Sequence, residues 1–157
     1  MIRRRTLCQI PAETTGGTAI EFALLGPVFI GLLIGVLQIG IGMQAHNAVR
    51  SVVAESARQA VVQYQTSNEI SEAVMEAQTL SIATGDVYRL DPGAIEVNVD
   101  PVTPSRVQGA REFTITVDYQ VPTVLNLMGW DSPEISHSRP VFVIDSSAAT
   151  PAPAPTP

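Results

Sequence analysis

Two glycines and a glutamate at the start of a long apolar stretch are the residues whose types and spacing suggest chemistry. Gly16 and Gly17 follow a basic leader, and Glu21 directly precedes the uncharged run 22–43. Cleavage between the two glycines would create an ammonium group on Gly17, four residues before Glu21. A carboxylate at the edge of a membrane-length segment carries a free-energy cost, which an ammonium group on a neighbouring subunit would offset. The alternative is that Glu21 simply lies at the level of the lipid headgroups.

Three further residues of the apolar stretch suggest helix packing. Gly31 and Gly35 form a GxxxG pattern, in which small residues one turn apart let a second helix approach closely. Glycine is also frequent in membrane helices generally, so both explanations stay open. Pro27 predicts a kink or a freed carbonyl group, or a small cost if it lies near the first turn.

The apolar stretch is long enough to anchor the chain in a membrane, since a bilayer core needs roughly 20 residues of helix. Arg3, Arg4 and Arg5 precede it, which predicts a cytoplasmic leader at 1–16 and an exported region from residue 44 onward. A cleaved secretory signal is the alternative. However, its apolar core would span only roughly 7–15 residues, and no clean Ala-x-Ala site follows.

Composition excludes several function classes. The 157 residues carry 9 basic and 15 acidic side chains, for a net charge of -6, which argues against nucleic acid as a partner. Cys8 is the single cysteine and lies in the leader. His46 and His137 lack the further ligands that a metal site needs. No catalytic motif is present, so we expect no active site, no metal, no cofactor and no small-molecule substrate.

The helix is expected to continue beyond the transmembrane segment 17–43 as an amphipathic region, 44–84. Small residues recur there at three- and four-residue spacing: Ala45, Ala48 or Val49, Val52, Ser56, Ala60 and Tyr64. Residues 66–69 resemble a capping box that opens a second helical piece. The predicted apolar face of this piece consists of Ile70, Ala73, Val74, Ala77 and Leu80, and Gly85 and Asp86 end it.

From residue 85 to 145 the pattern changes to period two, which predicts a small antiparallel sheet of about three strands. The first strand contains Ile95, Val97 and Val99, and Pro101 and Pro104 end it. The second runs over 112–121, with Phe113, Ile115, Val117 and Tyr119 on one face. The third covers 139–144, with a start as early as Ile135 as the alternative. Leu125, Leu127, Met128 and Trp130 form an apolar loop that either docks a partner or fills the core. The Pro/Ala-rich tail 146–157 is expected to be disordered. The fold class is therefore α+β.

The residues from Thr18 to Pro27, after an arginine-rich leader, resemble the start of the TadE-like proteins, minor pseudopilins of the Tad (Flp) tight-adherence pilus systems of bacteria. The resemblance implies cleavage by a prepilin peptidase after Gly16, with Glu21 as the assembly residue. It also implies other pilins and pilus platform proteins as partners and the bacterial inner membrane as the location. One departure is that the chain has Glu21-Phe22 where major Tad pilins often have Glu-Tyr. It also has a large exported domain, which favours a minor pseudopilin over a bulk filament subunit.

Three hypotheses follow. In the first, the chain is a minor pseudopilin or assembly component that packs through its N-terminal helix. In the second, it is an anchored exported binding module with no role in a filament. In the third, the apolar segment is removed entirely and the mature chain begins near His46.

Overall fold

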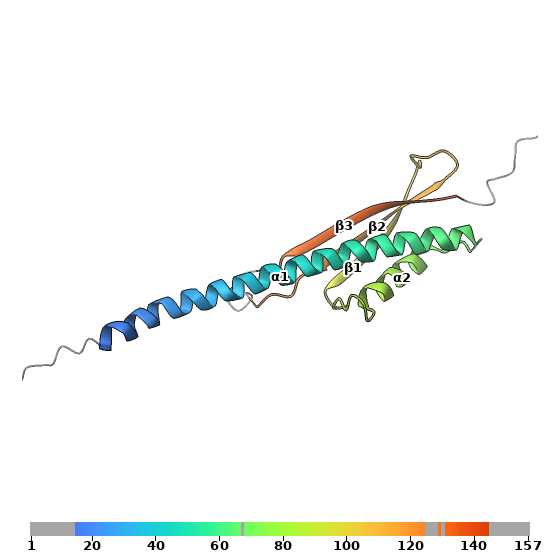
Figure 1. The fold of residues 1–157 in the computed structure, drawn as a ribbon. Helices are drawn as coiled ribbons and strands as arrows, with labels where there is room; N and C mark the ends of the chain where they lie inside the picture. Colours follow the sequence, from blue (N-terminus) through green and yellow to red (C-terminus); the bar gives the residue numbers. More distant parts are fainter. Residues whose placement is uncertain (1–14, 67, 125–128, 130, 145–157) are drawn as a thin grey trace, which may run out of the picture. The chain divides into compact units, whose positions relative to one another are not determined.

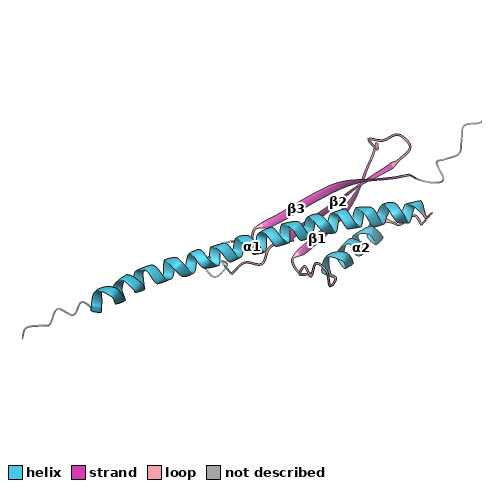
Figure 2. Cartoon of the chain, in the orientation of Figure 1, coloured by secondary structure: helices cyan, strands magenta, loops and turns pink. Residues whose placement is uncertain are grey.

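The computed structural model describes residues 15–66, 68–124, 129 and 131–144. Within these residues the elements are α1 (Thr15–Gln65), α2 (Glu72–Thr84), β1 (Ile95–Val102), β2 (Arg111–Gln120) and β3 (Glu134–Val143) (Figure 1, Figure 2). The predicted architecture of a long N-terminal helix and a three-stranded antiparallel sheet is confirmed. The chain separates into two compact units, Met1–Leu37 and Gln38–Pro157, and α1 contributes to both. The basic leader, most of the predicted apolar loop and the Pro/Ala-rich tail lie outside the described residues.

The sheet has β2 at its centre and β1 and β3 at its edges. In its antiparallel register Val117 lies opposite Val97 on one side and His137 on the other. The prediction that Pro101 ends the first strand is wrong, because β1 continues through it to Val102. A proline has no amide group to donate and is therefore tolerated on an edge strand. Pro140 occupies the same kind of position in β3, so both edges carry a residue that discourages further strand pairing.

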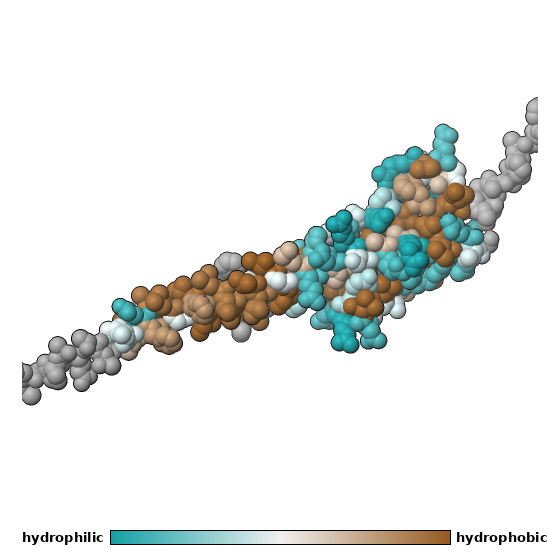
Figure 3. Space-filling view, viewed as in Figure 1, coloured by the Kyte–Doolittle hydropathy of each residue, from teal (hydrophilic) through white to brown (hydrophobic). Residues whose placement is uncertain are grey.

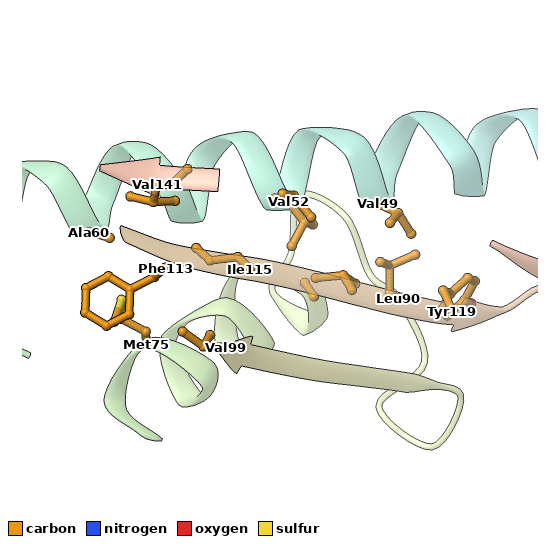
Figure 4. Close-up of a cluster of buried hydrophobic side chains, with 14 of the residues drawn as sticks. Val49, Val52, Ala60, Met75, Leu90, Val99, Phe113, Ile115, Tyr119 and Val141 are labelled. Carbon is orange, nitrogen blue, oxygen red and sulfur yellow. The ribbon is translucent and has the colours of Figure 1, made fainter. Parts of the chain in front are cut away.

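The alternating residues of β2 form the centre of the hydrophobic core. Phe113, Ile115, Val117 and Tyr119 are all buried, which confirms the period-two prediction. They belong to one cluster with residues of both helices and both edge strands (Figure 4). The third strand begins at Glu134, so the earlier of the two predicted starts is the better one.

One face of α1 covers this core. The buried residues of this face are Ala45, Val49, Val52, Val53, Ser56, Ala57, Ala60 and Tyr64. The predicted line of residues from Ala45 to Tyr64 is confirmed as the core-facing seam of α1. Val53 and Ala57 make this seam wider than predicted. A sheet offers a broad, nearly flat surface, so it covers an arc of the helix rather than a single line of side chains.

The connection between the two helices differs from the prediction. The side chain of Thr66 donates to the carbonyl of Gln63 at 2.8 Å, and so belongs to the end of α1. The Tyr64 hydroxyl donates to the carbonyl of Ile70 at 3.1 Å and holds the connection against the core. α2 begins only at Glu72, with Ser71 as its N-cap and without a side-chain cap hydrogen bond. The predicted capping box at 66–69 is therefore wrong, although the predicted end of the helix before Gly85 is confirmed.

The buried face of α2 is also different from the predicted one. Met75, Thr79 and Ala83 are buried, while the predicted stripe is exposed at Ala73, Val74, Ala77 and Leu80. The sequence offers two apolar stripes, and the neighbouring strand selects between them. As an edge strand, β1 has free amide groups, and the Val99 amide donates to the Glu76 carboxylate at 3.2 Å. In the structure this hydrogen bond accompanies the rotation of α2 that turns Met75 and Thr79 inward.

An ion pair between the exposed Arg106 and the buried Glu112 holds the connection between β1 and β2. The side chain of Glu112 is 0% exposed. It accepts hydrogen bonds from the Arg106 amide at 2.8 Å, from Arg106 Nε at 2.6 Å and from Arg106 Nη2. These hydrogen bonds, first those of the guanidinium and then that of the amide, hold the pKa of the Glu112 carboxyl below its usual range. The guanidinium also lies over the Phe142 ring, 5.6 Å from its centroid.

Candidate assembly site on the N-terminal helix

The predicted cleavage pair lies in the first turn of α1. The helix begins at Thr15, so Gly16 and Gly17 are both helical. Glycine destabilises a helix by about 1 kcal/mol relative to alanine, and helix termini open at little cost in free energy. Two consecutive glycines at this terminus therefore lower the stability of the first helical turn.

Glu21 and Phe22 lie on the exposed surface of the helix, one turn further along. The Phe22 side chain is 79% exposed, and its apolar neighbours Ile20 and Leu24 are exposed to a similar extent. The Glu21 carboxylate is thus a single charge on an apolar surface. In water this arrangement costs little, whereas in a membrane such a charge needs a partner or access to the headgroups.

Gly17, Glu21, Gly31 and Gly35 share one side of α1. With 3.6 residues per turn, these four positions fall within an arc of about 80°. An added Cβ atom at Gly17, Gly31 or Gly35 would meet no atom within 4 Å, so the glycine surface is open. The charged position and the close-approach positions therefore face the same direction, separated along the axis by about 15–21 Å at 1.5 Å per residue.

Pro27 lies inside α1, and the helix continues through it. Because proline has no amide hydrogen, the carbonyl of Ala23 lacks its usual helical donor four residues on. The structure therefore places Pro27 in the interior of α1 and not at its first turn. A freed carbonyl or a kink at this position stays a prediction.

The N-terminal part of α1 has the length and composition of a membrane anchor. Within the described part of the chain, α1 is the one helix long and apolar enough to cross a membrane. Its large side chains are exposed all around, and its surface is hydrophobic (Figure 3). The exposed large apolar residues of this surface include Leu25, Val28, Phe29, Leu32, Leu33 and Val36. Such a surface is not covered by the described residues of its own unit and indicates membrane anchoring.

The two histidines do not gain metal ligands from the fold. His46 is exposed on α1, and His137 is partly buried on β3. Among the residues that the structure describes, no three His, Cys, Asp or Glu side chains are grouped so that they could hold a metal ion.

Sequence reasoning considered Glu21 and the GxxxG pair separately and missed that they share a side of the helix with Gly17. Counting 100° per residue would have shown it. It also missed Gln38, the single polar residue within the apolar run. The Nε2 atom of Gln38 donates to the carbonyl of Pro122 at 3.0 Å, 84 residues away. A lone amide in an uncharged stretch is itself the signal of a hydrogen-bonded contact.

Comparison with known proteins supports the resemblance seen in the motif. The family model of the TadE-like proteins matches residues 16–58. No curated protein and no solved structure matches the chain significantly. The matched segment contains the glycine pair, Glu21, the apolar surface and most of the core-facing seam of α1. Over residues 16–58, therefore, this chain is similar to the TadE-like proteins, the family that its N-terminal motif resembles.

Proposed function

We propose that the chain is a minor pseudopilin or assembly component of a Tad-type pilus. The observation that carries this proposal is the TadE-like match over a helix whose N-terminal surface is apolar all around. That combination indicates a membrane protein associated with a Tad pilus, and the TadE-like family is a structural family rather than an enzyme family. The role of minor pseudopilin, the inner-membrane location, the cytoplasmic N-terminus and cell adhesion as an outcome are parts of the proposal.

In the proposed mechanism, a prepilin peptidase removes the leader after Gly16. The new ammonium group on Gly17 then lies at the N-terminus of α1, where the helix dipole is unfavourable for a positive charge. The Glu21 carboxylate of a neighbouring subunit offsets this cost. In low dielectric the attraction is strong, and leaving either charge alone is costly, so the pair favours one register between subunits. Gly31 and Gly35, on the same side of the helix, allow the close approach that this register requires.

The exported unit presents the partner-binding surface in this proposal. Its core-facing seam on α1 is already covered by the sheet, so contacts with other pilins or platform proteins use the uncovered surfaces. The seam therefore stabilises the exported unit, while the N-terminal surface of α1 makes the contacts between subunits.

The first experiment determines the mature N-terminus of the membrane-extracted protein by mass spectrometry, in cells that contain the peptidase. We expect a start at Gly17. Gly16→Leu should retain the leader, whereas Gly26→Leu, a matched glycine with open space around it in the same helix, should be processed normally. An intact Met1 in the wild-type protein would contradict processing, and a start near His46 would identify the apolar segment as a removed signal.

The second experiment tests Glu21 in assembly. Glu21→Ala should reduce the number of pili and the cross-linking between subunits at least tenfold, while the protein stays in the membrane fraction. Glu21→Asp should retain part of the activity, and Glu96→Ala, at an exposed glutamate of β1, should have no effect. Wild-type assembly by Glu21→Ala, or full function after replacement of residues 1–43 by an unrelated anchor, would instead favour an anchored binding module.

A further inference from the structure

The end of the sheet that carries the β2–β3 connection is tied to α1 at the start of the second unit. Gln38 is the first residue of this unit, and its hydrogen bond to the Pro122 carbonyl joins the helix to the beginning of the connection. The bond pairs a side-chain donor with a backbone acceptor. At the edge of hydrocarbon, where water is scarce, such polar groups have to be paired with each other.

An apolar groove lies directly beside this hydrogen bond. It has a volume of about 390 Å³ and is lined by α1 and by both ends of the β2–β3 connection: Ile39, Gly42, Met43, His46, Asn47, Val121, Pro133 and Ile135. Gly42 contributes no side chain, which leaves the groove open. Val124, three residues after the groove residue Val121, is 60% exposed. Removing apolar surface from water stabilises a protein by about 25 cal/mol per Å². An apolar ligand that covered the groove would therefore bind with a favourable free energy.

The position of the groove along α1 identifies that occupant. A bilayer core takes roughly 20 helical residues. Counted from Gly17, that length ends near Val36; counted from Phe22, with Glu21 at the headgroups, it ends near Ile41. In either register Ile39 and Met43 lie within about 11 Å of the outer boundary at 1.5 Å per residue. The interfacial layer on each side of the core is itself roughly 5–7 Å thick.

We propose that phospholipids of the leaflet opposite the leader fill this groove, so that the β2–β3 end of the exported unit rests in the lipid interface. The inference rests on the membrane anchoring of the proposed function. The polarity of the lining changes along α1 as the polarity of a bilayer changes with depth. Ile39, Gly42 and Met43 lie nearest the hydrocarbon, while His46 and Asn47 lie further out, at the level of polar headgroups. Acyl chains near the glycerol level would cover the apolar lining, and the exported unit would be held close to the membrane surface.

Spin labels at matched positions test the proposal in the full chain. Single cysteines are introduced into a Cys8→Ala background at Val124 and at Val107, and the protein is reconstituted into phosphatidylethanolamine–phosphatidylglycerol vesicles. Val107 is the control, because it is a similarly exposed valine, at 47%, in the connection at the opposite end of β2. A third label at Leu33, 55% exposed on the apolar part of α1, reports on anchoring itself. Power saturation compares the accessibility of each label to oxygen, which partitions into lipid, and to a water-soluble nickel chelate.

We expect the oxygen-to-nickel accessibility ratio to be several-fold higher at Val124 than at Val107, and highest at Leu33. A lipid-like ratio at Leu33 with equal, water-like ratios at Val124 and Val107 would overturn the inference and leave the anchor intact. A water-like ratio at Leu33 would overturn both. Protection of Val124 from both reagents, with spin–spin broadening, would assign the groove to a second copy and also overturn the inference. If Val124→Cys disturbs the fold, Pro133→Cys, exposed on the sheet side of the groove, gives the same measurement.

Discussion

The two parts of α1 differ in how their apolar residues are arranged and in what surrounds them. Between Phe22 and Leu37 large side chains point outward on all sides and most are exposed. Between Ala45 and Tyr64 most apolar residues are alanine or valine, and the buried ones lie on one face, which the sheet covers, while Val62 is exposed. The part of the helix whose apolar residues are gathered on one face, with polar residues opposite, is thus the part that its own chain covers.

The charges follow the same division. Arg50 and Arg58 lie on the exposed side of the second part, where Arg58 pairs with Glu55 at 2.6 Å. The first part has no charged residue between Phe22 and Leu37, and Glu21 directly precedes it. A helix with a polar face can remain in water once its apolar face is covered, whereas a helix apolar all around requires lipid or other helices. The surface of the first part of α1 therefore indicates membrane anchoring.

The largest expected effect comes from placing the same charge in each part of the helix. Val52 is 0% exposed, so Val52→Asp would bury an unpaired carboxylate in the core of the second unit, Gln38–Pro157. We expect the amides of β2 to lose their protection from hydrogen exchange in the full chain. Val36→Asp, at an exposed position of the apolar part, should leave that protection unchanged.

Val36→Asp should instead weaken membrane insertion, because an aspartate in a membrane helix costs about 2.5–3.5 kcal/mol. Carbonate extraction of membranes measures this effect. If Val36→Asp also removed the exchange protection of β2, or if Val52→Asp preserved it, the division of α1 into an outward-facing and a core-covering part would be wrong.

The next prediction concerns acid stability of the core-covering part and its sheet. The folded-state pKa of Glu112 is lowered by Arg106, so the unfolded state binds the proton more readily. The contribution of this pair is fully present above the ordinary glutamate pKa of about 4.3. It is lost as the pH falls from there through the lower folded-state pKa. The difference in free energy of unfolding between wild type and Glu112→Gln should therefore be largest at neutral pH and shrink in acid.

Urea unfolding of the full chain, followed by hydrogen exchange of β2 between pH 7 and pH 3, measures this difference. Glu96→Gln, at an exposed position of β1, is the matched control and should follow the wild type at every pH. A wild-type-to-Glu112→Gln difference that stayed constant with pH would mean that the charge of Glu112 does not contribute to stability.

Much of the fold could be predicted because its patterns are local. The three- and four-residue spacing from Ala45 to Tyr64 specifies the covered face of α1, and strict alternation specifies the inner face of β2. The orientation of α2 could not be predicted, since two apolar stripes compete and a hydrogen bond from Val99 to Glu76 selects one. The burial of Glu112 could not be predicted either, because alternation places it with the polar residues and only Arg106, folding back from the connection, makes its burial favourable.

The candidate site divides in the same way. The positions of Gly16, Gly17 and Glu21 follow from their order in the sequence, and their common side with Gly31 and Gly35 follows from helix geometry. The groove beside Gln38 could not be predicted in this way, because its α1 residues lie 74 or more positions away from its other lining residues. Contacts of this kind depend on the complete fold, and no local pattern predicts them.

The smallest expected effect concerns an imperfection in the covered part of α1. The Ser56 hydroxyl is buried and, within the described part of the chain, has no hydrogen-bond partner. A buried unpaired hydroxyl costs about 1–3 kcal/mol of desolvation. Ser56→Ala removes this cost, keeps the small size that the sheet requires and improves helix propensity. It should stabilise the second unit by about 1 kcal/mol, measured as a higher urea midpoint for loss of β2 exchange protection.

Ser51→Ala, on the exposed side of the same helix, is the matched control. It gives the same gain in helix propensity as Ser56→Ala, but it removes no buried hydroxyl and so relieves no desolvation cost. Equal stabilisation by both changes would mean that the Ser56 hydroxyl costs nothing where it lies. Destabilisation by Ser56→Ala alone would show that the hydroxyl is paired in the assembled protein, and that the covered face of α1 also takes part in contacts from outside the chain. The division of α1 into a part covered by its own chain and a part that contacts its surroundings would then not hold at Ser56.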